Sequence, residues 1–252
     1  TEPIGRYEAK AVRVGAKAEG DGYVISGTKL FVNDANVADK VIVAARTSDK
    51  GSPEEGITLF IVDRESAGVS VQVLKTMAGD KQCEFTMDKV KVSKADVLGE
   101  VDKGWEIVKK VIEWAALAKA AEMQGGAQQV LEMTIQYGKD RVQFDRPIGS
   151  FQAIQHYMAD MSIDVDSARV SLHKAAWMLS EGIPCRREIS VIKGWLSEAY
   201  RRVTAQSHQI HAAIGFTKDH DLELYFRRAK AAELYFGDAD FHREIVAQEL
   251  GM

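Results

Sequence analysis

The chain has few cysteines, no long apolar run and no block of charge of one sign. Its only cysteines, Cys83 and Cys185, match neither a metal-ligand spacing nor a disulfide framework, so we expect a reducing compartment, the cytoplasm. No run reaches the roughly 20 apolar residues that span a bilayer, and no leader of charged and then apolar residues opens the chain, so no membrane span or anchor is indicated. The net charge is −4 with the two signs interspersed, so nucleic acid is not an expected partner.

Metal and phosphate-loop motifs are missing as well. The six histidines form no H-E-x-x-H, and His208 and His211 lack a carboxylate or cysteine partner at ligand spacing, so we expect no metal site. Gly125-Gly126 lies inside a helical pattern with no strand before it, which excludes a phosphate loop. The pair instead predicts close helix packing or a local bend.

What the chain does have is a clear division of pattern. With 252 residues and 46% apolar composition it can bury the core of one large or two small domains. Residues 1–100 carry β-branched runs broken by turn residues, which predict an antiparallel, barrel- or sandwich-like β domain. Residues 101–252 carry the period of long helices and predict a C-terminal bundle of about four or five helices. The expected fold class is α+β.

The segment that begins at Ser150 shows the helical period well. Its apolar residues recur at steps of three, four or seven: Phe151, Ile154, Met158, Met161, Val165, Leu172, Ala176 and Leu179. Ser150 is the predicted N-cap of this helix. Gly182, followed by Pro184, is the predicted stop signal.

The string RVQFDRPIGSFQAIQH, residues 141–156, resembles the segment between two long helices of acyl-CoA dehydrogenases. This resemblance implies bound FAD. Arg141, Gln143 and Phe144 would meet its pyrophosphate and adenine, and Phe151 and Gln152 would line the same cofactor. An arginine suits a diphosphate because its guanidinium donates paired, charge-assisted hydrogen bonds.

The start of the chain extends the resemblance. Thr1-Glu2-Pro3 resembles the motif that lies under the flavin ring in this family. Phe31, Val32 and Asn33 align with the aromatic-x-threonine element, in which the aromatic ring shields the flavin and the hydroxyl approaches N5. An alternative for Phe31 is an ordinary inward-facing strand residue, because aromatics are common in strands.

A third string, QIHAAIGF at residues 209–216, is similar to the family's Q-x-x-G-G-x-G-[FY]. Gln209 is retained, but Ala212 and Ala213 stand where the family has paired glycines that let the diphosphate approach backbone amides. Those amides remain available as donors if the two alanines keep helical dihedrals. All three would be cofactor contacts by the same resemblance.

The family's catalytic base is absent. Desaturation of an acyl-CoA needs a carboxylate to remove the α-proton while the β-hydride passes to flavin N5. The resemblance places this glutamate at Phe236 or, in a minority of the family, at Ala115, and neither residue is acidic. The candidate carboxylates are Glu113, Glu122 and Asp238, of which Asp238 is also expected near the cofactor. Each has the alternative of a solvated or ion-paired surface acid.

Several readings of the function stay open. The first is an acyl-CoA dehydrogenase of lipid metabolism and fatty acid β-oxidation, with electron-transfer flavoprotein as acceptor and an unusual carboxylate as base. The second is a catalytically silent FAD-binding subunit paired with a sister chain. A third is other flavin chemistry, such as enoyl thioester reduction or oxygen-dependent oxidation, and a fourth is a non-enzymatic helical scaffold.

The resemblance also implies an assembly. The arginine-phenylalanine element of the family reaches a neighbour's FAD, so we expect a homo- or heterotetramer, or a dimer. The chain opens with Thr1, close to a strand pattern, and we expect the family's N-terminal helical domain to lie outside this sequence and to supply part of the acyl pocket.

Overall fold

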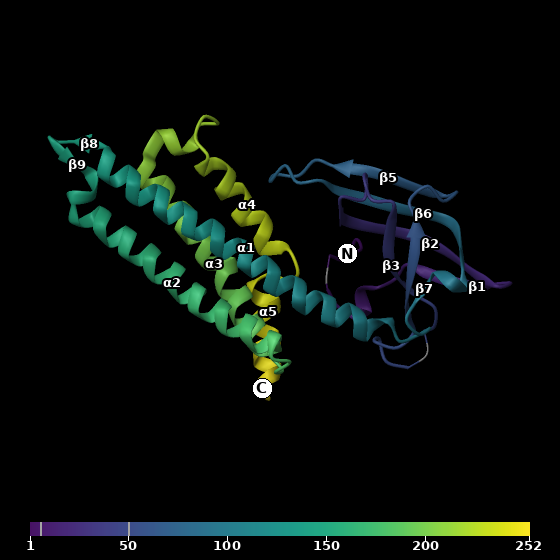
Figure 1. The fold of residues 1–252 in the computed structure, drawn as a ribbon. Helices are drawn as coiled ribbons and strands as arrows, with labels where there is room; N and C mark the ends of the chain where they lie inside the picture. Colours follow the sequence, from purple (N-terminus) through teal and green to yellow (C-terminus); the bar gives the residue numbers. More distant parts are fainter. Residues whose placement is uncertain (6, 50) are drawn as a thin grey trace. The chain divides into compact units, whose positions relative to one another are not determined.

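The computed structural model describes residues 1–5, 7–49 and 51–252 (Figure 1). The chain forms two compact units, Thr1–Ile112 and Glu113–Met252. Each unit has its own hydrophobic core. In the described part of the chain, no helix combines the length and the hydrophobicity needed to cross a membrane.

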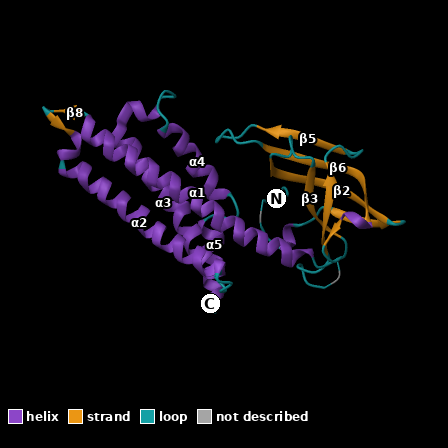
Figure 2. Ribbon diagram, in the orientation of Figure 1, coloured by secondary structure: helices purple, strands orange, loops and turns teal. Residues whose placement is uncertain are grey.

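The first unit is built on one seven-stranded sheet, drawn in orange in Figure 2. Its strands are β1 Gly15–Glu19, β2 Gly22–Asn33, β3 Lys40–Arg46, β4 Ile57–Asp63, β5 Val69–Leu74, β6 Gln82–Ser93 and β7 Val97–Leu98, and short 3-10 turns lie at Ala9–Ala11 and Lys94–Asp96. They are ordered β5-β6-β2-β1-β3-β4-β7, and every pair is antiparallel except β1 with β3. The predicted antiparallel domain is therefore confirmed, with one parallel contact.

The sheet follows from the apolar runs of the sequence. Hairpin β1–β2 closes through the two-residue turn Gly20-Asp21, in which Gly20 has a φ of +58°. Phe60 on β4, Phe85 on β6 and Ile25 on β2 are fully buried in the core of this unit. Their side chains, with the other apolar residues of the core, hold the sheet together.

The second unit is helical. Its helices are α1 Gly104–Asp140, which begins in the first unit, α2 Gln152–Ser180, α3 Arg186–His211, α4 Leu222–Leu234 and α5 Ala239–Glu249. A small hairpin, β8 Val142–Gln143 and β9 Arg146–Pro147, precedes α2, and 3-10 turns lie at Ile148–Ser150 and Ala212–Phe216. Helix α3 packs against α2, α4 and α5. The prediction of a C-terminal helical bundle is confirmed.

The predicted boundaries of α2 are partly wrong. Phe151, not Ser150, is the N-cap residue, and its side chain makes no capping hydrogen bond. The Ser150 hydroxyl instead donates to the carbonyl of Pro147 at 2.7 Å, because a 3-10 turn precedes the helix. The predicted stop is confirmed, since α2 ends at Ser180 and Gly182 follows with a φ of +68°.

The glycine pair in α1 has the packing role that the sequence predicts. A Cβ on Gly126 would lie 2.3 Å from the hydroxyl oxygen of Tyr200 on α3. A larger residue at this position would force the tyrosine aside. Gly125, by contrast, faces open space.

Candidate functional site

The N-terminal segment is held against β2, next to Phe31. The amide of Leu30 donates to the carbonyl of Thr1 at 2.9 Å, and the Thr1 hydroxyl donates back to the carbonyl of Leu30 at 3.3 Å. The carboxylate of Glu2 accepts from the ammonium of Lys29 at 2.6 Å and from the amides of Arg13 and Val14. These bonds fix the Thr1-Glu2-Pro3 segment against β2.

Phe31 is not an inward-facing strand residue. The register of β2 against β6 shifts between Lys29 and Val32, which makes Phe31 part of a β-bulge. Its φ is +57°, a conformation that costs a bulky residue on the order of 1 kcal/mol or more, and its side chain is 53% exposed. Val32 is half-buried and Asn33 is exposed. The bulge therefore turns an aromatic ring out of the sheet.

The hairpin after α1 presents the second group of predicted residues. Phe144 and Asp145, at its tip, have φ values of +54° and +62°, as a type I′ turn requires. Phe144 is 86% exposed and meets the ring of Phe151 edge to face, with 6.0 Å between centroids. The guanidinium of Arg146 lies over the same Phe151 ring at 4.0 Å.

The polar residues of this hairpin are open to solvent. Arg141 and Gln152 are exposed, and the Gln143 amide donates to the carbonyl of Val142. Among the described residues, the guanidinium of Arg141 has neither an ion pair nor a side-chain hydrogen bond. Arg141 is thus an available cation beside an exposed aromatic ring.

The end of α3 carries the third group. Gln209, Ala212 and Ala213 are all exposed. Ala212 does not have helical dihedrals, since its φ of +54° and ψ of −138° are values that glycine adopts readily. The condition for a free Ala212 amide is therefore not met, and this amide donates to the carbonyl of His208.

The turn from α4 to α5 holds Phe236, the position at which the base is missing. Phe236 is half-buried against the core of the helical unit and has a φ of +57°. Gly237 follows with a φ of +102°, and a Cβ there would meet the Phe241 ring. We call residues 235–238 the 235–238 turn.

Two buried side chains that the sequence analysis did not single out, Lys193 and His242, hold this turn. Lys193, on α3, is fully buried, and its ammonium donates to the carbonyls of Gly237 at 2.7 Å and Glu233 at 3.1 Å and to the hydroxyl of Ser197 at 3.1 Å. Burial, opposed by the Glu233 and Asp238 carboxylates, lowers the pKa of Lys193 from 10.5 to about 8. The sequence indicates only that Lys193 falls among the buried positions of α3, and it does not indicate what the ammonium binds.

The other is His242, on α5. Its Nε2 lies 3.1 Å from the carbonyl of Phe236. Burial, together with the nearby Lys193 cation, lowers the pKa of His242 from 6.5 to about 4, so the imidazole is neutral at physiological pH.

All three candidate carboxylates have partners. Asp238 is the N-cap of α5 and accepts from the amide of Phe241 at 2.9 Å. Glu113 pairs with Arg186 at 3.4 Å, and Glu122 pairs with Lys119 at 2.6 Å on the surface. Ala115 is half-buried on α1 and offers no acid. Asp238 is the candidate that lies in the 235–238 turn.

The predicted site residues fall into four groups. Thr1, Phe31, Val32 and Asn33 belong to the first unit. The hairpin, the end of α3 and the 235–238 turn belong to the second. In the described ranges, no cluster of three or more histidine, cysteine or acidic residues could hold a metal ion, and both cysteines are buried, unpaired thiols.

Comparison with known protein families matches both units. Residues 1–90 match the middle domain of acyl-CoA dehydrogenase, and residues 102–251 match its C-terminal domain. Among curated relatives, a 3-(aryl)acrylate reductase of Clostridium sporogenes is 33% identical over 99% of this chain and 67% of its own length. Caffeyl-CoA reductase-Etf complex subunit CarC of Acetobacterium woodii is 31% identical over 98% of this chain and 66% of its own length.

Solved structures agree. Butyryl-CoA dehydrogenase from Megasphaera elsdenii superposes with a TM-score of 0.95 at 29% identity, covering all of this chain and 67% of that one. A chain of the ChsE4-ChsE5 complex from Mycobacterium tuberculosis gives a TM-score of 0.86 at 31% identity, covering 95% of this chain and 63% of that one. The chain thus spans about two thirds of the length of these proteins. By these matches over both of its units, it belongs to the acyl-CoA dehydrogenase family of flavoenzymes.

Proposed function

We propose that this chain is an FAD-dependent oxidoreductase that desaturates an acyl-CoA thioester between Cα and Cβ, with a base other than residue 236. Bound FAD would take the β-hydride at N5. The observation that carries the proposal is Phe31, an exposed ring on a strained bulge beside the Thr1 segment. Strain of this kind persists only where the surrounding structure enforces it, and it concentrates at functional sites.

The hairpin residues fit the phosphate and adenine end of this cofactor. Arg141 offers a guanidinium that has no ion pair within residues 1–5, 7–49 and 51–252, and Phe144 offers an exposed ring on a tight turn of defined geometry. Gln143, Phe151 and Gln152 lie on or beside the same hairpin. We propose that this group binds the cofactor of a neighbouring chain, as the family resemblance implies.

The end of α3 fits the diphosphate. The Ala212 amide donates to the carbonyl of His208, so we propose that the amide of Ala213 meets the diphosphate, with the exposed Gln209 about one turn before it. We propose that residues 1–100 contact the flavin ring and that residues 101–252 contact the diphosphate and adenine. The proposed flavin-ring contacts therefore belong to the first unit, and the proposed diphosphate and adenine contacts belong to the second.

Anaerobic titration of the purified full-length holoprotein with a panel of saturated acyl-CoA thioesters tests the activity. Loss of flavin absorbance with any of them supports desaturation. Reoxidation of the reduced protein by an enoyl-CoA would show the reverse reaction, which the similarity to two reductases favours as a second direction. No spectral change with either set would contradict the proposal for this chain alone.

Asp238 is the carboxylate to test first. Asp238→Asn removes the acid but keeps the N-cap, because an asparagine side chain also accepts from the amide of Phe241. If Asp238 is the base, the rate of flavin bleaching falls by at least about 100-fold in this variant, and its stability is unchanged. An unchanged rate of bleaching would mean that Glu113, Glu122 or a residue outside this sequence is the base.

A second candidate is a silent FAD-binding subunit. The observation that favours it is that Asp238, Glu113 and Glu122 are all engaged, so none is poised to take a proton. The similarity to a chain of the ChsE4-ChsE5 complex supports it further. Bleaching that appears only after a co-encoded homologue is added would establish this role.

The outer face of α2 supports assembly. Ile163, Val170 and Trp177 are exposed at seven-residue spacing and form one apolar stripe. Asp166 and Lys174 lie four residues before and after Val170, so two antiparallel copies of α2 would bring opposite charges to the same level along the helix axis. We propose that a second copy of this chain covers the stripe. Val170→Glu should then reduce the mass measured by light scattering, and an unchanged mass would contradict this.

The remaining partners are proposed from relatives. CarC carries the name of a reductase-Etf complex, which supports electron-transfer flavoprotein as the acceptor here. The cytoplasm remains the proposed location, and the two unpaired thiols support it.

A further inference from the structure

The carbonyl groups on both sides of the Phe236 side chain are bound by buried residues from two different helices. His242, on α5, binds the carbonyl of Phe236 itself. Lys193, on α3, binds the carbonyls of Gly237 and Glu233. The backbone of the 235–238 turn is therefore bound at residues 236 and 237, and the end of α4 is bound at residue 233.

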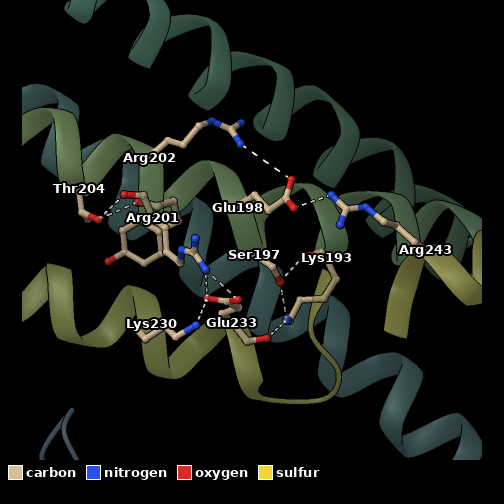
Figure 3. A network of polar contacts seen from close by, with 10 residues as sticks. Lys193, Ser197, Glu198, Arg201, Arg202, Thr204, Lys230, Glu233 and Arg243 are labelled. Atoms are coloured by element: carbon tan, nitrogen blue, oxygen red, sulfur yellow. Dashed lines mark hydrogen bonds and ion pairs between the residues drawn. The ribbon is translucent and has the colours of Figure 1, made fainter. Parts of the chain in front are cut away.

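The Lys193 ammonium uses all of its donors, and two of them hold the backbone at the end of α4 and in this turn. It is fully buried, and its three ammonium protons match three acceptors, namely two backbone carbonyls and the hydroxyl of Ser197. Figure 3 shows the bonds to Ser197 and Glu233. The Ser197 hydroxyl in turn donates to the Lys193 carbonyl at 2.8 Å, so the ammonium is oriented from its own helix. A buried cation without acceptors would be strongly unfavourable, which makes this arrangement specific.

The end of α4 is fixed from the other side. The carboxylate of Glu233 is nearly buried and receives the guanidinium of Arg201 at 3.0 Å and the ammonium of Lys230 at 3.0 Å. The last turn of α4 therefore cannot unwind without breaking these ion pairs. Phe236 holds a φ of +57° between the anchored carbonyls of Glu233 and Gly237.

We infer that Lys193 and His242 are positioning residues that hold Phe236 in its left-handed conformation, so that its ring forms a fixed wall of the acyl-group site. This inference rests on the proposed function, which places the 235–238 turn at that site. Phe236 then shapes the acyl-group site and takes no part in proton transfer. The acyl groups that fit the site depend on the hydrogen bonds from Lys193 to the carbonyls of Glu233 and Gly237. The ligand is the acyl chain of a CoA thioester.

Amide hydrogen exchange on the full-length holoprotein tests the positioning role directly. Lys193→Met and His242→Leu should each speed exchange at residues 235–241 by about tenfold while α2 keeps its protection. His242→Gln keeps a donor for the Phe236 carbonyl and should exchange as the wild type does. Lys91→Met, a change at an exposed lysine of β6 in the first unit, is the control.

The exchange result has two contrary outcomes. Unchanged exchange at residues 235–241 in both Lys193→Met and His242→Leu would overturn the inference. An equal rise across all helices would also overturn it, because it would mean that the two residues stabilise the bundle as a whole rather than the turn. If Lys193→Met does not fold, His242→Leu against His242→Gln decides the question alone.

Ligand binding tests the specificity role. Calorimetric Kd values for butyryl-CoA and octanoyl-CoA should change their ratio by about tenfold in Phe236→Ala, and Lys193→Met should change it in the same direction. An unchanged ratio in both variants, with wild-type binding intact, would overturn the inference while leaving the proposed function standing. Wild-type protein that binds neither thioester would instead contradict the proposed function and the acyl-site part of the inference, and the exchange data would still decide the positioning part.

Discussion

The Nε2 atom of His242 lies 3.1 Å from the carbonyl oxygen of Phe236, and this bond fixes the tautomer of the neutral imidazole. A carbonyl can only accept, so Nε2 carries the proton and Nδ1 has a lone pair. Within the described ranges Nδ1 is buried with no hydrogen-bond partner, and the Lys193 ammonium lies nearby. A second proton on this ring would thus be buried, unpaired and close to another cation.

Acid should therefore destabilise the helical unit through His242. The folded-state pKa is about 4 against 6.5 in the unfolded chain, so between these values the unfolded state binds a proton that the folded state does not. Stability is lost as the pH falls from 6.5 to 4, by on the order of 3 kcal/mol from this group. Urea unfolding of wild type and His242→Gln at several pH values measures it. Parallel pH profiles for the two proteins would contradict the assignment.

The Glu2–Lys29 pair should be a strong contributor to the stability of the first unit. Both side chains are largely buried, at 6% and 12% exposed, and burial is the main cause that lowers the pKa of Lys29. Glu2→Ala leaves a buried ammonium without its partner and should cost about 3 kcal/mol. The control is Glu19→Ala, which removes the exposed pair with Lys91 and should cost under about 0.5 kcal/mol in the same thermal unfolding assay. Equal losses would refute the distinction.

Ala212→Gly should stabilise the protein. The methyl group at φ +54° is strained, and glycine relieves this strain at the price of some entropy in the unfolded chain, for a net gain of up to about 1 kcal/mol. Ala213, whose φ is not positive, is the matched control, because glycine there should cost about 0.5–1 kcal/mol. Opposite shifts in Tm are expected. A loss in both variants would mean that Ala212 is not strained in solution.

Phe236→Glu should restore a proton acceptor to the 235–238 turn. The anchored backbone of the turn does not depend on the side chain at 236, since Lys193 and His242 bind carbonyl groups. In the anaerobic titration with acyl-CoA we expect this variant to bleach at least about tenfold faster than the wild type, and Phe236→Gln, which has the same shape but no acid, to show no gain. An equal rate for the two variants would show that residue 236 cannot act on the substrate.

Much of the fold could be predicted from the sequence because its patterns are local. The β-branched runs of residues 1–100 and the helical period after them indicate a sheet unit and a bundle, and Gly182 marks the end of α2. The close approach at Gly126 also follows from a glycine pair within a helix. Ser150 was misjudged as a cap because a 3-10 turn, which has no strong sequence signal, takes its hydroxyl.

The candidate site was less predictable, because it depends on contacts between residues distant in the chain. Lys193 lies 44 residues before Gly237, and nothing in its own helix indicates that its ammonium binds that carbonyl. The bulge at Phe31 depends on the register of β2 against β6, which no local pattern specifies. The positive φ of Ala212 departs from what alanine favours and could be anticipated only from the family's glycine.

The flavin content of the full-length protein is the most direct measurement. We expect the purified or reconstituted protein to hold one FAD per chain, seen by its visible absorbance, and Arg141→Ala to lower FAD affinity by at least about tenfold with no change in Tm of the cofactor-free protein. Arg169→Ala, a change at an exposed arginine on α2, should leave the affinity unchanged. A colourless protein that takes up no FAD, or an Arg141→Ala variant that binds it as tightly as the wild type, would contradict a cofactor site built on this hairpin.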